Sequence, residues 1–134
     1  MTNVDRIKAL YAAFGRGDVS AIVEMTAEDV DWGLASDAPG IERLAWVRAG
    51  EGRAAVLGYF RGVGETMDVH AFEPVLVLGE GDSVLALIDI DFTVRPTGKR
   101  LRSREAMHFT FDRSGRIARY RPLFDTAERV AAYS

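Results

Sequence analysis

The sequence predicts an α+β domain whose helices pack on one face of a curved, mainly antiparallel sheet. Three observations predict this class. Helical periodicity dominates the first half of the chain, a period of two dominates from residue 68 onward, and glycine-containing turns separate four strand-like runs. With 134 residues, 48% of them hydrophobic, we expect one domain, residues 1–134, around a single core.

Two short helices are expected at the start of the chain. Between residues 4 and 14, apolar side chains recur every three or four positions, which predicts an amphipathic helix that ends at Gly15 and Gly17. Asp18 has a side chain suited to the N-cap of a second helix, and apolar residues share one face over residues 19–23. The chain therefore begins with a pair of helices.

A strand, a long loop and a third helix are expected next. Residues 29–32 alternate between acidic and apolar side chains, which is typical of a half-buried strand. Residues 35–50 contain a proline and two glycines, so we expect a long loop, and loops of this length are usually functional or mobile. The apolar spacing over residues 56–63 predicts a helix that stops at Gly62 and Gly64.

Four strands are expected in the second half. The turn signals are glycine-containing segments at residues 79–82, 96–98 and 112–115. We therefore expect an antiparallel meander with strands near residues 68–78, 83–95, 99–111 and 116–124. Asp125 and Glu128 have the spacing of a helix cap, so a final helical turn should follow the last strand.

One face of the expected meander is apolar and should pack against the helices. Its members are Ile90, Phe92, Met107, Phe109, Tyr120 and Phe124. Glu105 falls on the same face, and burial raises the pKa of an unpaired carboxyl, so Glu105 is the first candidate for a general acid or base. The alternative is that Glu105 lies at the open sheet edge, solvated or bonded to an arginine. Tyr120 is either a wall residue with a bonded hydroxyl or a donor to a developing oxyanion.

Further candidates lie in other strands, in the third helix and in the long loop. His70 is expected on the face of Phe72, either as a general acid or base near a cavity mouth or as a surface histidine. Trp32 and Tyr59 are expected to line the cavity, with Trp32 as plain core the alternative. Trp46, in the long loop, either covers an apolar ligand or fills a hydrophobic gap. The expected ligand-binding set is Trp32, Trp46, Tyr59, Phe92, Met107, Phe109 and Phe124.

The composition narrows the chemistry. The chain has no cysteine and only two histidines, which excludes thiolate catalysis and disfavours a metal site, so none is expected. It has no phosphate-binding loop or nucleophile elbow, and no cofactor is expected. Charges interrupt the first eight residues and no apolar run approaches ~20 residues, so we expect a soluble, cytoplasmic protein without a membrane partner.

The basic residues are unevenly distributed. Nine of the 17 lie between Arg95 and Arg121, with only Glu105 and Asp112 as acidic residues in that segment. A nucleic-acid partner is disfavoured because the formal net charge is −3 and the strands concerned also carry acids. We expect instead a homodimer through the outer sheet face, formed by Asp89, Asp91, Arg102, Arg104, Arg119 and Arg121.

Three segments carry a family resemblance. They are Leu10-Tyr-Ala-Ala-Phe-Gly-Arg-Gly-Asp18, Ala27-Glu-Asp-Val-Asp-Trp32 and Gly115-Arg-Ile-Ala-Arg-Tyr-Arg-Pro-Leu-Phe-Asp125. With the order of elements, they make the whole chain resemble the NTF2-like superfamily, and within it the SnoaL-like and ketosteroid-isomerase-like proteins. The resemblance implies a cone-shaped α+β barrel, a deep apolar pocket between helices and sheet, and commonly a dimer through the sheet.

The resemblance does not extend to the isomerase's catalytic residues. The positions of its tyrosine, its aspartate base and its protonated aspartate correspond to Leu10, Leu34 and Met107, so steroid isomerisation in that form is excluded. We expect a protein that binds a small apolar organic molecule. If it is an enzyme, it should be a cofactor-free acid–base isomerase, cyclase or hydrolase. The alternative is a non-catalytic ligand-binding or dimerisation module.

Overall fold

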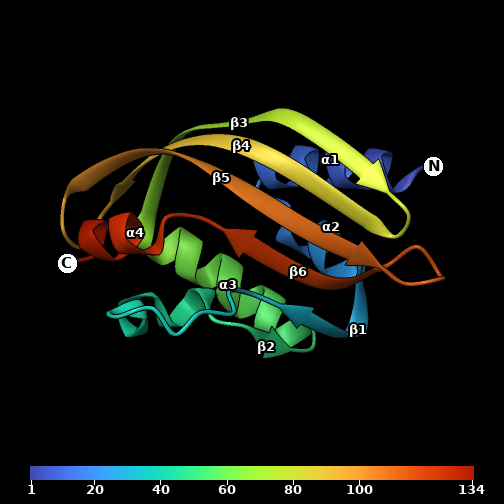
Figure 1. Ribbon diagram of the computed structural model, residues 1–134, viewed down its shortest axis with the longest axis horizontal. Helices are drawn as coiled ribbons and strands as arrows, with labels where there is room; N and C mark the ends of the chain where they lie inside the picture. Colours follow the sequence, from blue (N-terminus) through green and yellow to red (C-terminus); the bar gives the residue numbers. More distant parts are fainter.

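Six strands form one open sheet with the order β2-β1-β6-β5-β4-β3, and the helices lie against it (Figure 1). The computed structural model describes residues 1–134. The helices are α1 (Asn3–Gly15), α2 (Val19–Glu24), η1 (a 3₁₀ helix, Ile41–Val47), α3 (Arg53–Thr66) and α4 (Thr126–Ala132). The strands are β1 (Thr26–Trp32), β2 (Gly50–Glu51), β3 (Met67–Glu80), β4 (Ser83–Val94), β5 (Lys99–Phe111) and β6 (Ile117–Leu123). None of the helices is long and apolar enough to cross a membrane.

The predicted antiparallel meander is confirmed. Strands β3, β4, β5 and β6 pair in sequence order, each antiparallel to the next. Strand β1 then pairs with β6 in the parallel direction, and the short β2 pairs antiparallel with β1. The sheet is therefore mainly antiparallel and curved, with β2 and β3 as its two edges.

The first two helices begin and end as predicted because their caps are local. The Thr2 hydroxyl accepts a hydrogen bond from the backbone N–H of Asp5 at 3.0 Å, and the Asp5 carboxylate accepts one from the N–H of Thr2 at 3.1 Å. The Asp18 carboxylate accepts from the N–H of Ala21 at 3.1 Å and so caps α2. Such caps satisfy backbone donors that a helix leaves free at its start.

Two sequence predictions in the middle of the chain are wrong. Helix α3 does not stop at Gly62 but continues to Thr66, because the indole of Trp46 packs directly on the helix where Gly62 has no side chain. A Cβ atom at Gly62 would lie 2.3 Å from Cγ of Trp46. The expected loop over residues 35–50 contains η1 and β2, since packing against the rest of the protein orders this segment.

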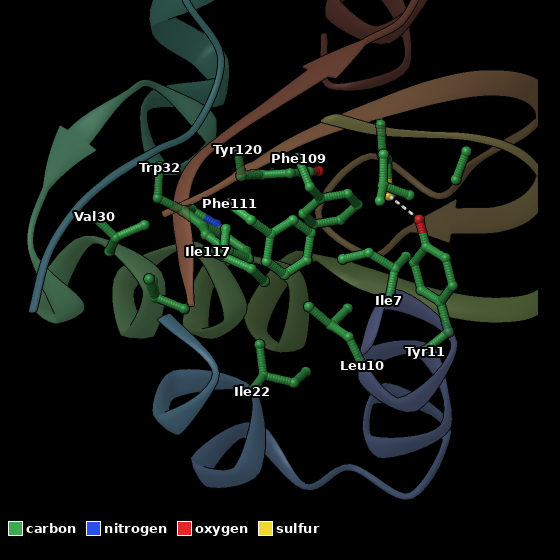
Figure 2. Close-up of a cluster of buried hydrophobic side chains, with 14 of the residues drawn as sticks. Ile7, Leu10, Tyr11, Ile22, Val30, Trp32, Phe109, Phe111, Ile117 and Tyr120 are labelled. Carbon is green, nitrogen blue, oxygen red and sulfur yellow. Dashed lines mark hydrogen bonds between the residues drawn. The ribbon is translucent and has the colours of Figure 1, made fainter. Parts of the chain in front are cut away.

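The main core lies between the helices and the inner face of the sheet. Figure 2 shows side chains from the first two helices meeting aromatic side chains from the strands, among them Ile7, Leu10, Ile22, Phe109 and Tyr120. Alternate residues of β4 point inward and are buried, as the period of two predicts. The predicted phase of β5 is also correct, because Glu105, Met107 and Phe109 are all buried.

A second, smaller cluster joins η1 to α4 at the end of the molecule where the chain terminates (Figure 1). Its buried members are Leu34, Ile41, Leu44, Val47 and Val130. Polar contacts add to this packing: the hydroxyls of Thr66 and Tyr133 are 2.8 Å apart, and Nη1 of Arg43 donates to the Ser134 hydroxyl at 2.9 Å. The final helix is therefore part of the fold and covers one end of the space between helices and sheet.

Candidate functional site

A narrow cavity of about 50 Å³ lies within the main core. Of the 17 residues that line it, 15 are hydrophobic, and the only two charged ones are Glu105 and Arg129. The lining comes from the helices α1, η1, α3 and α4 and from five strands of the sheet, all except β2. A volume of this size has room for a few water molecules, so a larger ligand requires side chains of the wall to move.

Glu105 and Arg129 form a buried ion pair in this apolar wall. Nη2 of Arg129 donates a hydrogen bond to Oε2 of Glu105 at 3.3 Å, and each side chain is 5% exposed. Burial raises the pKa of Glu105, and the opposing attraction of Arg129 only partly offsets that rise. The Arg129 guanidinium also lies over the rings of Phe124, at 4.1 Å, and Phe92, at 4.9 Å.

One oxygen of the Glu105 carboxylate has no hydrogen-bond partner in the protein. Its Oε2 is bonded to Arg129, and Oε1 accepts no hydrogen bond from the protein. A carboxylate oxygen of this kind accepts protons and hydrogen bonds from whatever occupies the cavity. The geometry therefore combines a held, charged group with a free proton-accepting atom.

Two tyrosine hydroxyls meet in the same wall. The oxygens of Tyr59 and Tyr120 lie 2.9 Å apart, and either one is able to donate to the other. One hydroxyl proton forms that bond, so the second proton has no acceptor within the pair. Burial, which is the main cause, together with the nearby charge of Glu105 raises the pKa of Tyr59. Burial likewise raises the pKa of Tyr120. Both hydroxyls consequently stay protonated and act as donors.

The remaining polar atoms of the wall are weakly bonded or unpartnered. The hydroxyl of Tyr11 donates to the sulfur of Met107 at 3.4 Å, drawn as the dashed line in Figure 2. The buried indole nitrogens of Trp32 and Trp46 have no hydrogen-bond partner. Both rings meet Tyr59 edge to face, with centroids 6.1 Å and 5.4 Å from it. The cavity wall thus presents more free donors than free acceptors.

Most of the predicted site residues line this cavity. Those on its wall are Trp32, Trp46, Tyr59, Glu105, Met107, Phe109 and Tyr120. Phe92 and Phe124 are not on the wall, because both lie against the guanidinium of Arg129 instead. Their contact with a ligand stays a prediction that the cavity lining does not support, whereas the inward orientation predicted for Phe92 agrees with its full burial.

His70 does not reach the cavity. A bulge in β3 places Val69 opposite Phe92 and Ala71 opposite Asp91, which makes His70 the extra residue. Its Nε2 atom lies 2.7 Å from the hydroxyl of Thr93, and the ring is exposed. The prediction that His70 shares the face of Phe72 is wrong, because strict alternation does not hold across a bulge. His70 lines a separate hollow, which shares Tyr11, Phe14, Val69 and Phe72 with the cavity.

Arg129 is the site residue that sequence reasoning missed. It lies in the last helix, 24 positions after Glu105, and nothing local links the two side chains. One signal was present, since a carboxyl on an apolar face requires a cation or a proton to offset its burial. The structure supplies that cation from α4. There is no group of three or more His, Asp or Glu side chains arranged to hold a metal ion.

The outer sheet face carries the predicted cross-strand ion pairs. Asp89 lies opposite Arg104 and Asp91 opposite Arg102, with nitrogen–oxygen distances of 2.7 Å and 3.2 Å. Arg119 and Arg121 pair instead with Asp31 of β1, at 3.4 Å and 2.6 Å. The same face also has an unpredicted apolar half with the exposed side chains of Leu76, Leu78, Leu85 and Leu123.

These features define an α+β domain of the NTF2-like class, with a curved, open sheet and helices around a cavity. An NTF2-like protein of unknown function from Burkholderia pseudomallei matches with a TM-score of 0.85 at 21% identity, over 100% of this chain and 99% of that one. A candidate SnoaL-like polyketide cyclase from Mesorhizobium loti matches with a TM-score of 0.73 at 22% identity, over 92% of this chain and 100% of that one. TerC, co-crystallised with polyporic acid, matches with a TM-score of 0.79 at 21% identity, over 98% of this chain and 97% of that one.

The family is established by the sequence match. The family model of the SnoaL-like domain matches residues 7–120, and the chain belongs to this family. The comparison with curated proteins gives no match. Only about a fifth of the positions are identical between this chain and these solved structures, so the comparison establishes the fold. The chemistry depends on the residues of the site itself.

Proposed function

We propose that this protein binds a small, largely apolar organic molecule in the cavity and exchanges a proton with it at Glu105. The observation that carries the proposal is the carboxylate of Glu105, 5% exposed in an otherwise apolar wall, with one oxygen held by Arg129 and the other free. A cofactor-free isomerisation, cyclisation or hydrolysis needs such a group.

The electrostatics suit a general base. Burial raises the pKa of Glu105, which brings its proton affinity closer to that of a weakly acidic carbon or hydroxyl. Arg129 favours the charged form of the carboxyl and orients it. The spare proton of the Tyr59–Tyr120 pair is a suitable donor to the oxygen that becomes negative when a neighbouring proton leaves.

The positions that correspond to the ketosteroid isomerase's catalytic residues add no competing group. Leu10 and Met107 contribute apolar side chains to the wall, and Leu34 is buried in the smaller cluster beside η1. Glu105 is therefore the only carboxyl group on the cavity wall. TerC has the same fold and has been co-crystallised with polyporic acid, which supports an organic ligand for this fold but not a particular one.

A second candidate function is a non-catalytic binding module. It is favoured by the small volume of the cavity, about 50 Å³, and by the ion pair, in which Arg129 compensates the charge of the carboxylate. The two functions differ in one measurable property. A binder retains its ligand unchanged, whereas a base exchanges the ligand's acidic protons with solvent.

Proton exchange in heavy water distinguishes the two. The probe is 2-indanone, a compact ketone whose protons next to the carbonyl are replaced by deuterium when a base removes them. We expect the protein to accelerate this exchange, and Glu105→Gln to reduce the acceleration by about 100-fold or more while 2-indanone still binds. Binding without exchange would identify a non-catalytic module. Undiminished exchange in Glu105→Gln would remove Glu105 from the mechanism.

We also propose that two copies associate through the outer sheet face in the cytoplasm. The face carries both acids and arginines, so a two-fold axis is able to place unlike charges opposite one another. The face also carries exposed leucines, among them Leu78, 56% exposed, and Leu123, 55% exposed. A group of exposed apolar side chains is typical of a surface that contacts another protein. A soluble homodimer of this kind leaves the cavity on the opposite side of the sheet.

A further inference from the structure

The cavity has two chemically different regions. Around α4 its wall contains the Glu105–Arg129 pair and the Tyr59–Tyr120 hydroxyls. Around α1 it is closed by phenyl rings, where Phe14 lies 4.9 Å from Phe72 and 5.9 Å from Phe60 between ring centroids. A ligand that satisfies both regions carries a polar group at one end and an apolar body at the other.

Trp46 stands at the polar region and is firmly held there. Its ring packs on Gly62, meets Tyr59 at 5.4 Å and lies 6.2 Å from Tyr133, the residue that ends α4. Its position follows from packing on three sides, so its N–H group has a defined place in the wall. The residue lines the cavity.

The indole N–H of Trp46 is buried and donates to no atom of the protein. Buried donors are almost always paired, because an unpaired one loses its bond to water without compensation. The surrounding partners of Trp46 are aromatic rings, the backbone of Gly62 and the apolar side chains of two buried clusters, and none of these is an acceptor for its N–H. Because Trp46 lines the cavity, a molecule bound there is the candidate acceptor for this N–H.

We infer that the N–H of Trp46 donates a hydrogen bond to a carbonyl oxygen of the bound molecule and so makes Trp46 a specificity-determining residue. This rests on the proposed function, since it assumes that the cavity is the ligand site. The preferred ligand is a compact ketone whose oxygen lies at the polar region and whose hydrocarbon body lies against the phenyl rings. The free tyrosine proton offers the same oxygen a second donor.

Trp32 lines the same cavity and is the competing donor with which Trp46 is compared. Its indole nitrogen is also unpartnered, but the ring is only 2% exposed and is stacked at 4.4 Å on Tyr120 within the main core. Trp32 belongs to β1, whereas Trp46 belongs to the segment that packs on α4. Replacing either indole by phenylalanine removes one N–H and retains an aromatic ring.

The test compares the binding of 2-indanone and of indane, its hydrocarbon analogue of nearly the same shape, by ligand-observed NMR titration. The measured quantity is the ratio of the two dissociation constants. We expect Trp46→Phe to weaken the preference for the ketone by roughly three- to tenfold, the range of one net hydrogen bond, and to leave the affinity for indane unchanged. Trp32→Phe should change the ratio by less than Trp46→Phe does, because Trp32 is packed inside the main core.

Each other outcome contradicts the inference in a recognisable way. An unchanged ratio in Trp46→Phe, or equal losses in the two variants, overturns the role of Trp46 and leaves ligand binding by the cavity intact. Failure of the wild-type protein to bind either probe overturns the inference and the proposed function together. Circular dichroism of each variant shows whether the fold is retained.

Discussion

Replacing Arg129 by methionine tests the ion pair most directly. Methionine has a long, flexible side chain that retains much of the packing against Phe92 and Phe124, but it leaves Glu105 without its partner. Both members of the pair are 5% exposed, so solvent does not screen the loss. Removal of one partner from a buried pair costs about 3–5 kcal/mol, and we expect Arg129→Met to lower the free energy of unfolding by that amount near neutral pH.

The defect should depend on pH in a defined direction. Burial already raises the pKa of Glu105, and without Arg129 nothing opposes the rise. Between the ordinary pKa of the unfolded chain and the raised pKa of the folded protein, the folded state binds more protons. Stability therefore falls as the pH increases through this window. Arg129→Met should be less destabilised at about pH 5 than at about pH 7.

Urea unfolding followed by tryptophan fluorescence measures both effects. The double variant Arg129→Met with Glu105→Leu removes the charge as well as its partner, and we expect it to recover most of the lost stability. A single variant within about 1 kcal/mol of wild type at neutral pH would refute the reasoning. So would a double variant that is less stable than Arg129→Met alone.

Three further perturbations follow from the packing. Gly62→Ala places a Cβ atom 2.3 Å from an indole carbon of Trp46 and should lower the free energy of unfolding by about 1–3 kcal/mol. Gly58→Ala in the same helix is the control, because its Cβ atom meets nothing within 4 Å, and it should not destabilise the protein. Tyr59→Phe removes one hydroxyl of the tyrosine pair and should cost about 1 kcal/mol, measured by urea unfolding. Leu85→Glu on the outer face should shift the dimer to monomer in sedimentation velocity. Leu57→Glu, at a similarly exposed position on α3, should leave the dimer intact. A monomeric wild-type protein would contradict the proposed dimer.

The predicted elements agree with the structure where the signal is local. The caps at Thr2 and Asp18 act over three residues, and the alternation in β4 reports directly which side chains are buried. The inward position of Glu105 also follows from alternation, because no bulge interrupts the pairing of β4 with β5. His70 shows the limit of the same method, since one extra residue in β3 changed its direction.

The cavity depends on contacts that no sequence window contains. Glycine in a helix is unfavourable by itself, and α3 nevertheless continues through Gly62, because the space left there is filled by Trp46 from a segment expected to be a loop. Tyr59 and Tyr120 are 61 positions apart and share one hydrogen bond. Such pairs are created by packing, and packing is decided by the whole molecule.

The amino-acid pattern alone determined the α+β class, the meander and the presence of one carboxyl on an apolar face. These depend on periodicity and on the cost of burying charge, which are properties of short segments. The tertiary structure decided that Arg129 is the partner of that carboxyl and that Trp46 and the tyrosine pair complete its surroundings. A buried charge requires a partner, but only the folding of α4 onto the sheet selects which one.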